Sequence, residues 1–202
     1  MDSIRHAVPN VITMSAMTCG ILAMVMDDPW FILVACILDK LDGTVARLLR
    51  VESAFGAELD SFADFISFGV APAFAMRHAY LSVKVVYILA TSCRLAKFNV
   101  TESVPFFMGV PSTLAGLIVA SLSLTLDLGQ VASSVVLVTF TWLMNSPIRI
   151  SKFGSAPVSM WVVVPLATAT MASIATRTWP VVPLVAGCAG LAIGIASARK
   201  RC

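Results

Sequence analysis

The sequence predicts an all-α membrane protein, a polytopic helical bundle with about eight transmembrane helices. Of its 202 residues, 58% are hydrophobic and only 12% are charged, and the mean hydropathy is +0.91. A soluble domain carries about 25% charged residues, so this chain has too little polar surface to cover a water-exposed globule. Apolar runs also recur along the chain at close to the length of about 20 residues that a membrane helix needs. We therefore expect residues 1–202 to form a single integral membrane domain.

Eight apolar segments, separated by short charged, proline or glycine breaks, are predicted to span the membrane. They are residues 9–26, 30–48, 56–76, 82–98, 110–127, 131–147, 157–176 and 179–198. The segment 1–8 before them mixes apolar and charged residues, which fits either a short interfacial helix or a frayed terminus. Asp27-Asp28-Pro29 and Asp127-Leu128-Gly129 are expected to be turns.

Lysine and arginine residues fall mainly on one side of this predicted topology. Eleven lie on one side, and three, Arg77, Lys84 and Arg177, lie on the other. Because cytoplasmic loops carry the excess of these residues, we expect both termini and the connection between the second and third spans to face the cytoplasm. The net charge is only +3, and most of the positive residues lie on one side of the predicted membrane topology. No nucleic-acid partner is expected.

Four aspartates interrupt the apolar sequence in the second and third predicted spans. Asp39 and Asp42 are three residues apart and Asp60 and Asp64 are four apart, so each pair shares one helix face. Asp42 lies nine residues before Val51 and Asp60 nine after it, so antiparallel helices would bring all four to the same depth. Acids within a membrane need a counter-charge. A set of oxygen donors alone favours magnesium, manganese or calcium over zinc.

The residues around these aspartates suit a ligand that carries phosphate. Gly43 costs a helix about 1 kcal/mol relative to alanine, but it lets a ligand approach the backbone closely. Ala46 widens the same groove, and Arg47 can bind a phosphate oxygen bidentately. Gly43 and Gly56, each taken alone, also fit a role in helix packing.

The spacing of these residues resembles the signature of the CDP-alcohol phosphotransferases, D-x2-D-G-x2-A-R-x8-G-x3-D-x3-D. Every fixed position of that signature is present between Asp39 and Asp64. The resemblance implies a membrane enzyme, usually dimeric, that moves a phosphatidyl group from a CDP-activated lipid to an alcohol and releases CMP.

The resemblance also implies roles for individual residues. Asp39, Asp42 and Asp60 would bind divalent metal, Mg²⁺ or Mn²⁺ with two ions in each site. Asp64 would be both a metal ligand and the catalytic base. The CDP-binding residues would be Gly43, Ala46, Arg47 and Gly56, together with Asn10 and Thr13 of the first span, whose N-x2-T spacing is similar to a family element.

Three later segments resemble the phosphatidylserine synthase branch of this family: residues 56–73, 94–100 and 106–112. This resemblance implies CDP-diacylglycerol as the donor and L-serine as the acceptor. Arg94, Lys97 and Asn99 are the candidates for binding the acceptor, although Arg94 and Lys97 fit equally well as interfacial anchors.

Two other functions are compatible with the sequence. One is the same reaction with glycerol-3-phosphate, an inositol phosphate or an archaeal CDP-lipid, for which Arg149 and Lys152 offer further positive charge. The other is a divalent-cation transporter that uses the aspartates as its transit site. Arg47 beside the acids would repel a passing cation, which disfavours transport.

Overall fold

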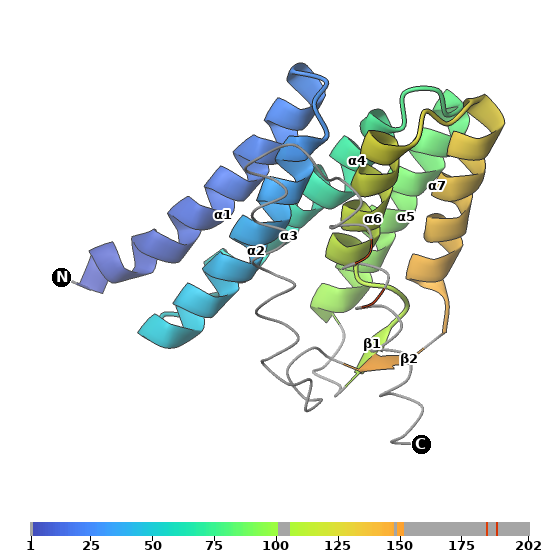
Figure 1. Cartoon of the computed structure of the whole chain (residues 1–202). Coiled ribbons are helices and arrows are strands. Elements are labelled where there is room, and N and C mark those ends of the chain that lie inside the picture. The colour runs from blue at the N-terminus through green and yellow to red at the C-terminus, as the bar shows by residue number, and fades with distance from the viewer. Residues whose placement is uncertain (1, 101–105, 148, 152–184, 186–188, 190–202) are drawn as a thin grey trace.

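The computed structural model describes residues 2–100, 106–147, 149–151, 185 and 189. Within these residues the chain forms helices that run back and forth between the two ends of a bundle (Figure 1). The helices are α1 (Asp2–Val25), α2 (Trp30–Leu49), α3 (Ala54–Asp64), the π-helix η1 (Phe65–Val70), α4 (Ala71–Ala75), α5 (Leu81–Val100), α6 (Ser112–Thr125) and α7 (Gln130–Asn145). Two short strands, β1 (Phe106–Met108) and β2 (Arg149–Ser151), pair antiparallel after α5 and α7.

The helices coincide with the first six predicted spans, and α3, η1 and α4 together form the third. The all-α prediction is confirmed for the described residues, with the β1–β2 pair as its one addition. Helix α1 begins at Asp2, so the described part of segment 1–8 is neither a separate interfacial helix nor frayed. The last two predicted spans, 157–176 and 179–198, lie outside the described residues.

One described helix is long and apolar enough to cross a membrane, over Ala7–Val25 with a mean hydropathy of 1.6. Helices α6 and α7 are apolar but shorter, with 14 and 16 residues. Helices α2 and α5 have 20 residues each, and both carry charged side chains. The described residues therefore form a helical bundle with one candidate membrane helix. The predicted number of eight membrane spans is not confirmed.

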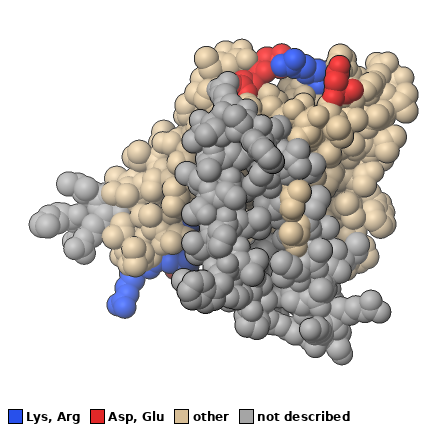
Figure 2. All heavy atoms as spheres, in the orientation of Figure 1, with Lys and Arg blue, Asp and Glu red and all other residues tan. Residues whose placement is uncertain are grey.

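Ion pairs tie the helix connections together at one end of the bundle. Arg77, after α4, donates to Asp27 in the α1–α2 turn at 2.9 Å. His78 lies 3.6 Å from Asp127 in the α6–α7 connection. Figure 2 shows acidic and basic side chains close together at this upper end. Both predicted turns, at Asp27 and Asp127, are found here, so the connections of three helix pairs meet at one end.

The π-helix η1 lies in the middle of the bundle and is closely packed. A Cβ atom added to Gly20 of α1 would lie 2.6 Å from the Oγ of Ser67. A Cβ atom added to Gly116 of α6 would lie 2.9 Å from the Cβ of Phe68. Both glycines therefore let neighbouring helices approach η1 more closely than alanine would. The segment that follows Asp64 is held on two sides.

Candidate functional site

Three of the four aspartates, two from the middle part of α2 and one from α3, meet in the half of the bundle nearer the α2–α3 connection. The chain reverses after α2 at Arg50, whose left-handed φ of 54° ends the helix sharply. One carboxylate oxygen from each of Asp39, Asp42 and Asp60 lies within 4.8 Å of the others. Two antiparallel helices thus place three oxygen donors around one point.

Asp64 lies one helical turn beyond Asp60 and is not in this group of three among the described residues. Its carboxyl group is within hydrogen-bonding reach of Asp39, and its charge is close enough to Arg94 of α5 to interact with it. The fourth aspartate therefore adjoins the cluster on the side that α5 covers.

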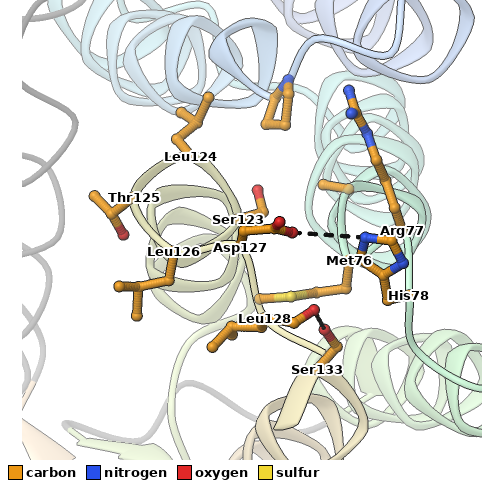
Figure 3. A pocket seen from close by; sticks show the side chains of 12 residues that line it. Met76, Arg77, His78, Ser123, Leu124, Thr125, Leu126, Asp127, Leu128 and Ser133 are labelled. Atoms are coloured by element: carbon orange, nitrogen blue, oxygen red, sulfur yellow. Dashed lines mark hydrogen bonds and ion pairs between the residues drawn. The ribbon is translucent and has the colours of Figure 1, made fainter. Parts of the chain in front are cut away.

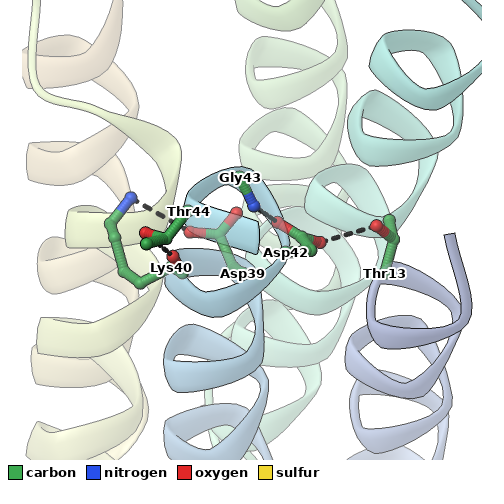
Figure 4. Close-up of polar contacts among 6 residues, drawn as sticks. All are labelled: Thr13, Asp39, Lys40, Asp42, Gly43 and Thr44. Carbon is green, nitrogen blue, oxygen red and sulfur yellow. Dashed lines mark hydrogen bonds and ion pairs between the residues drawn. The ribbon is translucent and has the colours of Figure 1, made fainter. Parts of the chain in front are cut away.

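Helix α1 fixes the orientation of Asp42, whose side chain is almost completely buried. The Thr13 hydroxyl donates to Oδ2 of Asp42 at 2.6 Å, and the Gly43 N–H donates to Oδ1 at 2.5 Å (Figure 4). The Thr13 oxygen also lies 3.0 Å from the Pro9 carbonyl, so its single proton serves one acceptor at a time. The 2.6 Å hydrogen bond from Thr13 to the Asp42 carboxylate is short enough to be of the stronger, charge-assisted kind. Thr13, expected to bind CDP, thus contacts a candidate metal ligand directly.

Asn10 and Gly56 bring the first turn of α3 against α1. A Cβ atom added to Gly56 would lie 3.3 Å from Oδ1 of Asn10 and 3.2 Å from Oγ of Ser53. The Ser53 hydroxyl also accepts the Gly56 N–H at 3.0 Å and caps α3. This crowding supports the packing interpretation of Gly56.

Gly43 has different surroundings, which leave its backbone open to a ligand. Within 4 Å, and apart from the backbone of α2 itself, a Cβ atom added there would meet only the guanidinium of Arg47 among the described atoms, at 3.6 and 3.9 Å. None of the described helices packs on Gly43, so the packing interpretation has no support at this position. An exposed arginine beside open backbone suits an anionic ligand, and Ala46 follows one turn along the same helix.

Lys40 is a cation at the site to which the sequence analysis gave no chemical role. Its Nζ lies 3.1 Å from Oδ2 of Asp39, as Figure 4 shows. The Lys40 side chain is 75% exposed, whereas that of Asp39 is 10% exposed. Lys40 lies between Asp39 and Asp42 in the sequence, and this position could have indicated that it neutralises part of the aspartates' negative charge.

The three candidate acceptor-binding residues occupy different surroundings. Arg94 is buried, and its Nη1 donates to the Met144 carbonyl at the end of α7 at 2.8 Å. Asn99 is exposed and its Nδ2 donates to the hydroxyl of Ser61 on α3 at 3.0 Å. Lys97 is exposed in the last turn of α5. The three therefore lie along one helix end without forming a single pocket wall.

A cavity of about 290 Å³ lies at the opposite end of the bundle. Figure 3 shows Asp127 directed at His78 across it, with Arg77 on the same wall. Pro29 also lines it, and Asp39 is ten residues further along α2, about 15 Å in a helix. The cavity is therefore separate from the aspartate cluster, and the chemistry of the side chains locates the site better than cavity shape.

The chain is similar to known proteins over most of its described residues. The family described as CDP-alcohol phosphatidyltransferase matches residues 6–147. A Methanocaldococcus jannaschii protein named CDP-diacylglycerol–serine O-phosphatidyltransferase is 32% identical over 160 residues, which cover 76% of this chain and 79% of the relative. A Bacillus subtilis protein of the same name is 32% identical over 162 residues, covering 72% and 90%.

A third relative carries a different name. The archaetidylserine synthase of Methanothermobacter thermautotrophicus is 31% identical over 170 residues, which cover 74% of this chain and 73% of the relative. The matched region contains the complete aspartate motif and every described helix from α2 to α7. The chain belongs to the CDP-alcohol phosphatidyltransferase family.

Proposed function

We propose that this chain transfers a phosphatidyl group from CDP-diacylglycerol to L-serine, giving phosphatidylserine and CMP. The observation that carries the proposal is the convergence of Asp39, Asp42 and Asp60 in a member of this family. The names of the relatives share serine and differ in the lipid, so serine is the better supported substrate. Residues 1–202 act as one catalytic domain, and two chains form a homodimer.

Divalent metal fits the aspartate cluster. Three carboxylate oxygens within 4.8 Å of one another are the hard donors that Mg²⁺ and Mn²⁺ prefer. Asp39, Asp42 and Asp60 would hold the first ion, and Asp64 beside Asp39 supplies a further donor for a second. When bound, the metal neutralises the pyrophosphate and stabilises the departing CMP.

The side chains of the site carry out the remaining steps. Asp64 accepts the proton of the serine hydroxyl. The serine oxygen then forms a bond to the phosphorus that bears diacylglycerol, and the bond from that phosphorus to the CMP oxygen breaks. Arg47, which lies over Gly43, holds a phosphate oxygen of the nucleotide. Ala46 leaves room for the nucleotide in the same groove.

Arg94, Lys97 and Asn99 bind the serine on the α5 side of the cluster. The charge of Arg94 is close enough to Asp64 to interact with it, which puts a cation on the side of the cluster where the serine carboxylate would bind. A cation at a helix C-terminus also stabilises that helix, so Arg94 has a second role at the end of α7.

The protein lies in the cell membrane, with its active site and both termini on the cytoplasmic side. The lipid tails of the substrate stay in the bilayer. The charge asymmetry of the sequence supports this orientation. The predicted topology assigns the sequence positions of Arg149 and Lys152 to the same side, and positive charge there attracts anionic headgroups.

We expect CMP release from CDP-diacylglycerol with L-serine and none with glycerol-3-phosphate or an inositol phosphate, in mixed micelles with Mn²⁺. Arg94→Ala or Lys97→Ala should raise the serine KM at least tenfold if bound serine desolvates the charge pair, because losing such a pair costs about 2–5 kcal/mol. The KM for CDP-diacylglycerol should stay nearly unchanged. Arg77→Ala removes a cation at the opposite end and serves as the control.

CMP release with glycerol-3-phosphate but not with serine would contradict the acceptor. Activity with an archaeal CDP-lipid alone would change only the donor. Uptake of Mn²⁺ into proteoliposomes without any CMP release would favour the transporter.

The aspartates should separate into two classes. Asp39→Asn, Asp42→Asn and Asp60→Asn should each abolish transfer and weaken Mn²⁺ binding, because each removes an anionic ligand. Asp64→Asn should abolish transfer but retain most CDP-diacylglycerol binding, because it removes the base. Asp127→Asn is the control at the opposite end. Equal loss of lipid binding in Asp64→Asn would make Asp64 mainly a metal ligand, and full activity in excess chelator would exclude metal.

Thr13→Val should weaken Mn²⁺ binding 10- to 100-fold, the usual range when the partner that orients a metal ligand is lost. The control is Thr18→Val on the same helix, because the exposed Thr18 hydroxyl donates to the Met14 carbonyl of its own helix, at 2.8 Å. Equal affinity in the two variants, measured by equilibrium Mn²⁺ binding, would show that Thr13 does not hold Asp42 for metal.

The orientation is tested with single cysteines in a cysteine-free background. Glu52→Cys, beside the reversal after α2, should resist an impermeant thiol reagent added outside sealed cells. Asp127→Cys, at the opposite end of the bundle, should react. The reverse pattern would invert the topology.

A further inference from the structure

Pro72 interrupts the helix that carries Asp60 and Asp64. In an α-helix the N–H at position 72 would bond the carbonyl of Phe68, but proline has no N–H and its ring would press on that carbonyl. The structure avoids this conflict by forming the π-helix η1, in which a turn holds about one more residue than an α-helical turn. The Ala71 N–H accordingly donates to the Ile66 carbonyl, five residues back.

Tyr87 of α5 provides a hydrogen-bond donor at the position where proline removes one. Its side chain is fully buried, with 0% exposure, and its hydroxyl donates to the Phe68 carbonyl at 3.2 Å. The hydroxyl thus bonds the very carbonyl that has lost its α-helical partner at Pro72. A buried tyrosine hydroxyl usually has a partner, and here that partner is the centre of η1.

The π-helix sets the rotation of the aspartates about the helix axis. It lies between α4, which packs within the bundle core, and α3, which carries Asp60 and Asp64. One extra residue rotates the two halves relative to each other by about 100°, compared with a continuous α-helix. In the observed setting Asp60 reaches the two aspartates of α2, and Asp64 reaches Asp39. If the helix were a continuous α-helix, the face that carries Asp60 and Asp64 would be rotated away from α2 by about 100°.

We propose that Tyr87 is a positioning residue that acts with Pro72 to hold η1 in the π conformation and so aim Asp60 and Asp64 at the metal site. Tyr87 bonds Phe68 and acts on the chemistry only through the helix. This inference rests on the proposed function, because it takes the aspartates to be metal ligands.

The test measures Mn²⁺ affinity by the EPR signal of free Mn²⁺ and thermal stability by unfolding, both on the purified full chain in detergent. Tyr87→Phe removes only the hydroxyl and should weaken Mn²⁺ binding at least tenfold while lowering kcat for CMP release. The control is Tyr80→Phe, because Tyr80 is the chain's other tyrosine and is exposed. That variant should keep the affinity of the unchanged protein.

Pro72→Ala in the Tyr87→Phe background separates positioning from stability alone. The alanine restores a backbone donor for the Phe68 carbonyl, so the Tm should recover. The Mn²⁺ affinity should remain weak, because the segment is then free to become a regular α-helix. If Tyr87→Phe cannot be purified folded, Pro72→Ala alone decides, and it should show weakened Mn²⁺ binding at a Tm no lower than that of the unchanged protein.

Normal Mn²⁺ affinity in Tyr87→Phe, or in Pro72→Ala where that variant decides, would overturn the positioning role. Recovery of affinity together with Tm in the double variant would also overturn it and leave Tyr87 a purely structural residue. If the unchanged chain binds no Mn²⁺, the proposed metal site itself fails and the positioning role fails with it.

Discussion

Four carboxylates gathered at one end of an apolar bundle are the constraint on which the rest of this structure depends. They repel one another and lose hydration, and in a membrane setting such groups are costly. Asp42 is compensated by two hydrogen bonds, and Lys40 lies against Asp39. These contacts neutralise only part of the charge. In the function we propose, a divalent metal held by these aspartates supplies the remainder and neutralises the pyrophosphate of the substrate.

The helices around the cluster are arranged to keep the carboxylates in place. Helix α1 contributes Thr13, the sharp reversal at Arg50 sets α3 beside α2, and η1 sets the rotation of the third helix. The end of α7 is fixed as well. The Val110 N–H donates to the Leu143 carbonyl at 3.1 Å, while Arg94 bonds the next carbonyl. Gly109, with φ at 72°, allows that approach, because any side chain there would overlap the Met144 carbonyl.

Much of this arrangement could be predicted from the sequence because it depends on local spacing. The distances of Asp42 and Asp60 from Val51 predicted that the two helices would bring their acids together. Hydrophobic runs predicted the first six helices, and the Asp27 and Asp127 turns were found where expected. Pro72 could have indicated an irregular helix, because it has no N–H to bond the Phe68 carbonyl, but residues 56–76 were predicted as one uninterrupted span.

What could not be predicted depends on contacts between distant residues. Spacing along one helix gives no sign that Tyr87 bonds Phe68, or that Thr13 bonds Asp42 rather than a nucleotide alone. The role of Arg94 at the end of α7 depends on a contact fifty residues away. The strands β1 and β2 are three residues each, too short to give an alternating pattern, and they pair across two intervening helices.

The most direct test of a metal site that acts on the pyrophosphate is a sulfur substitution in the substrate. CDP-diacylglycerol in which one non-bridging pyrophosphate oxygen is replaced by sulfur should react slowly with Mg²⁺, because a hard ion binds sulfur poorly. A softer ion such as Mn²⁺ or Cd²⁺ should restore the rate for one of the sulfur diastereomers. If every diastereomer loses the same rate with hard and soft ions alike, the metal does not contact the pyrophosphate and the account is wrong.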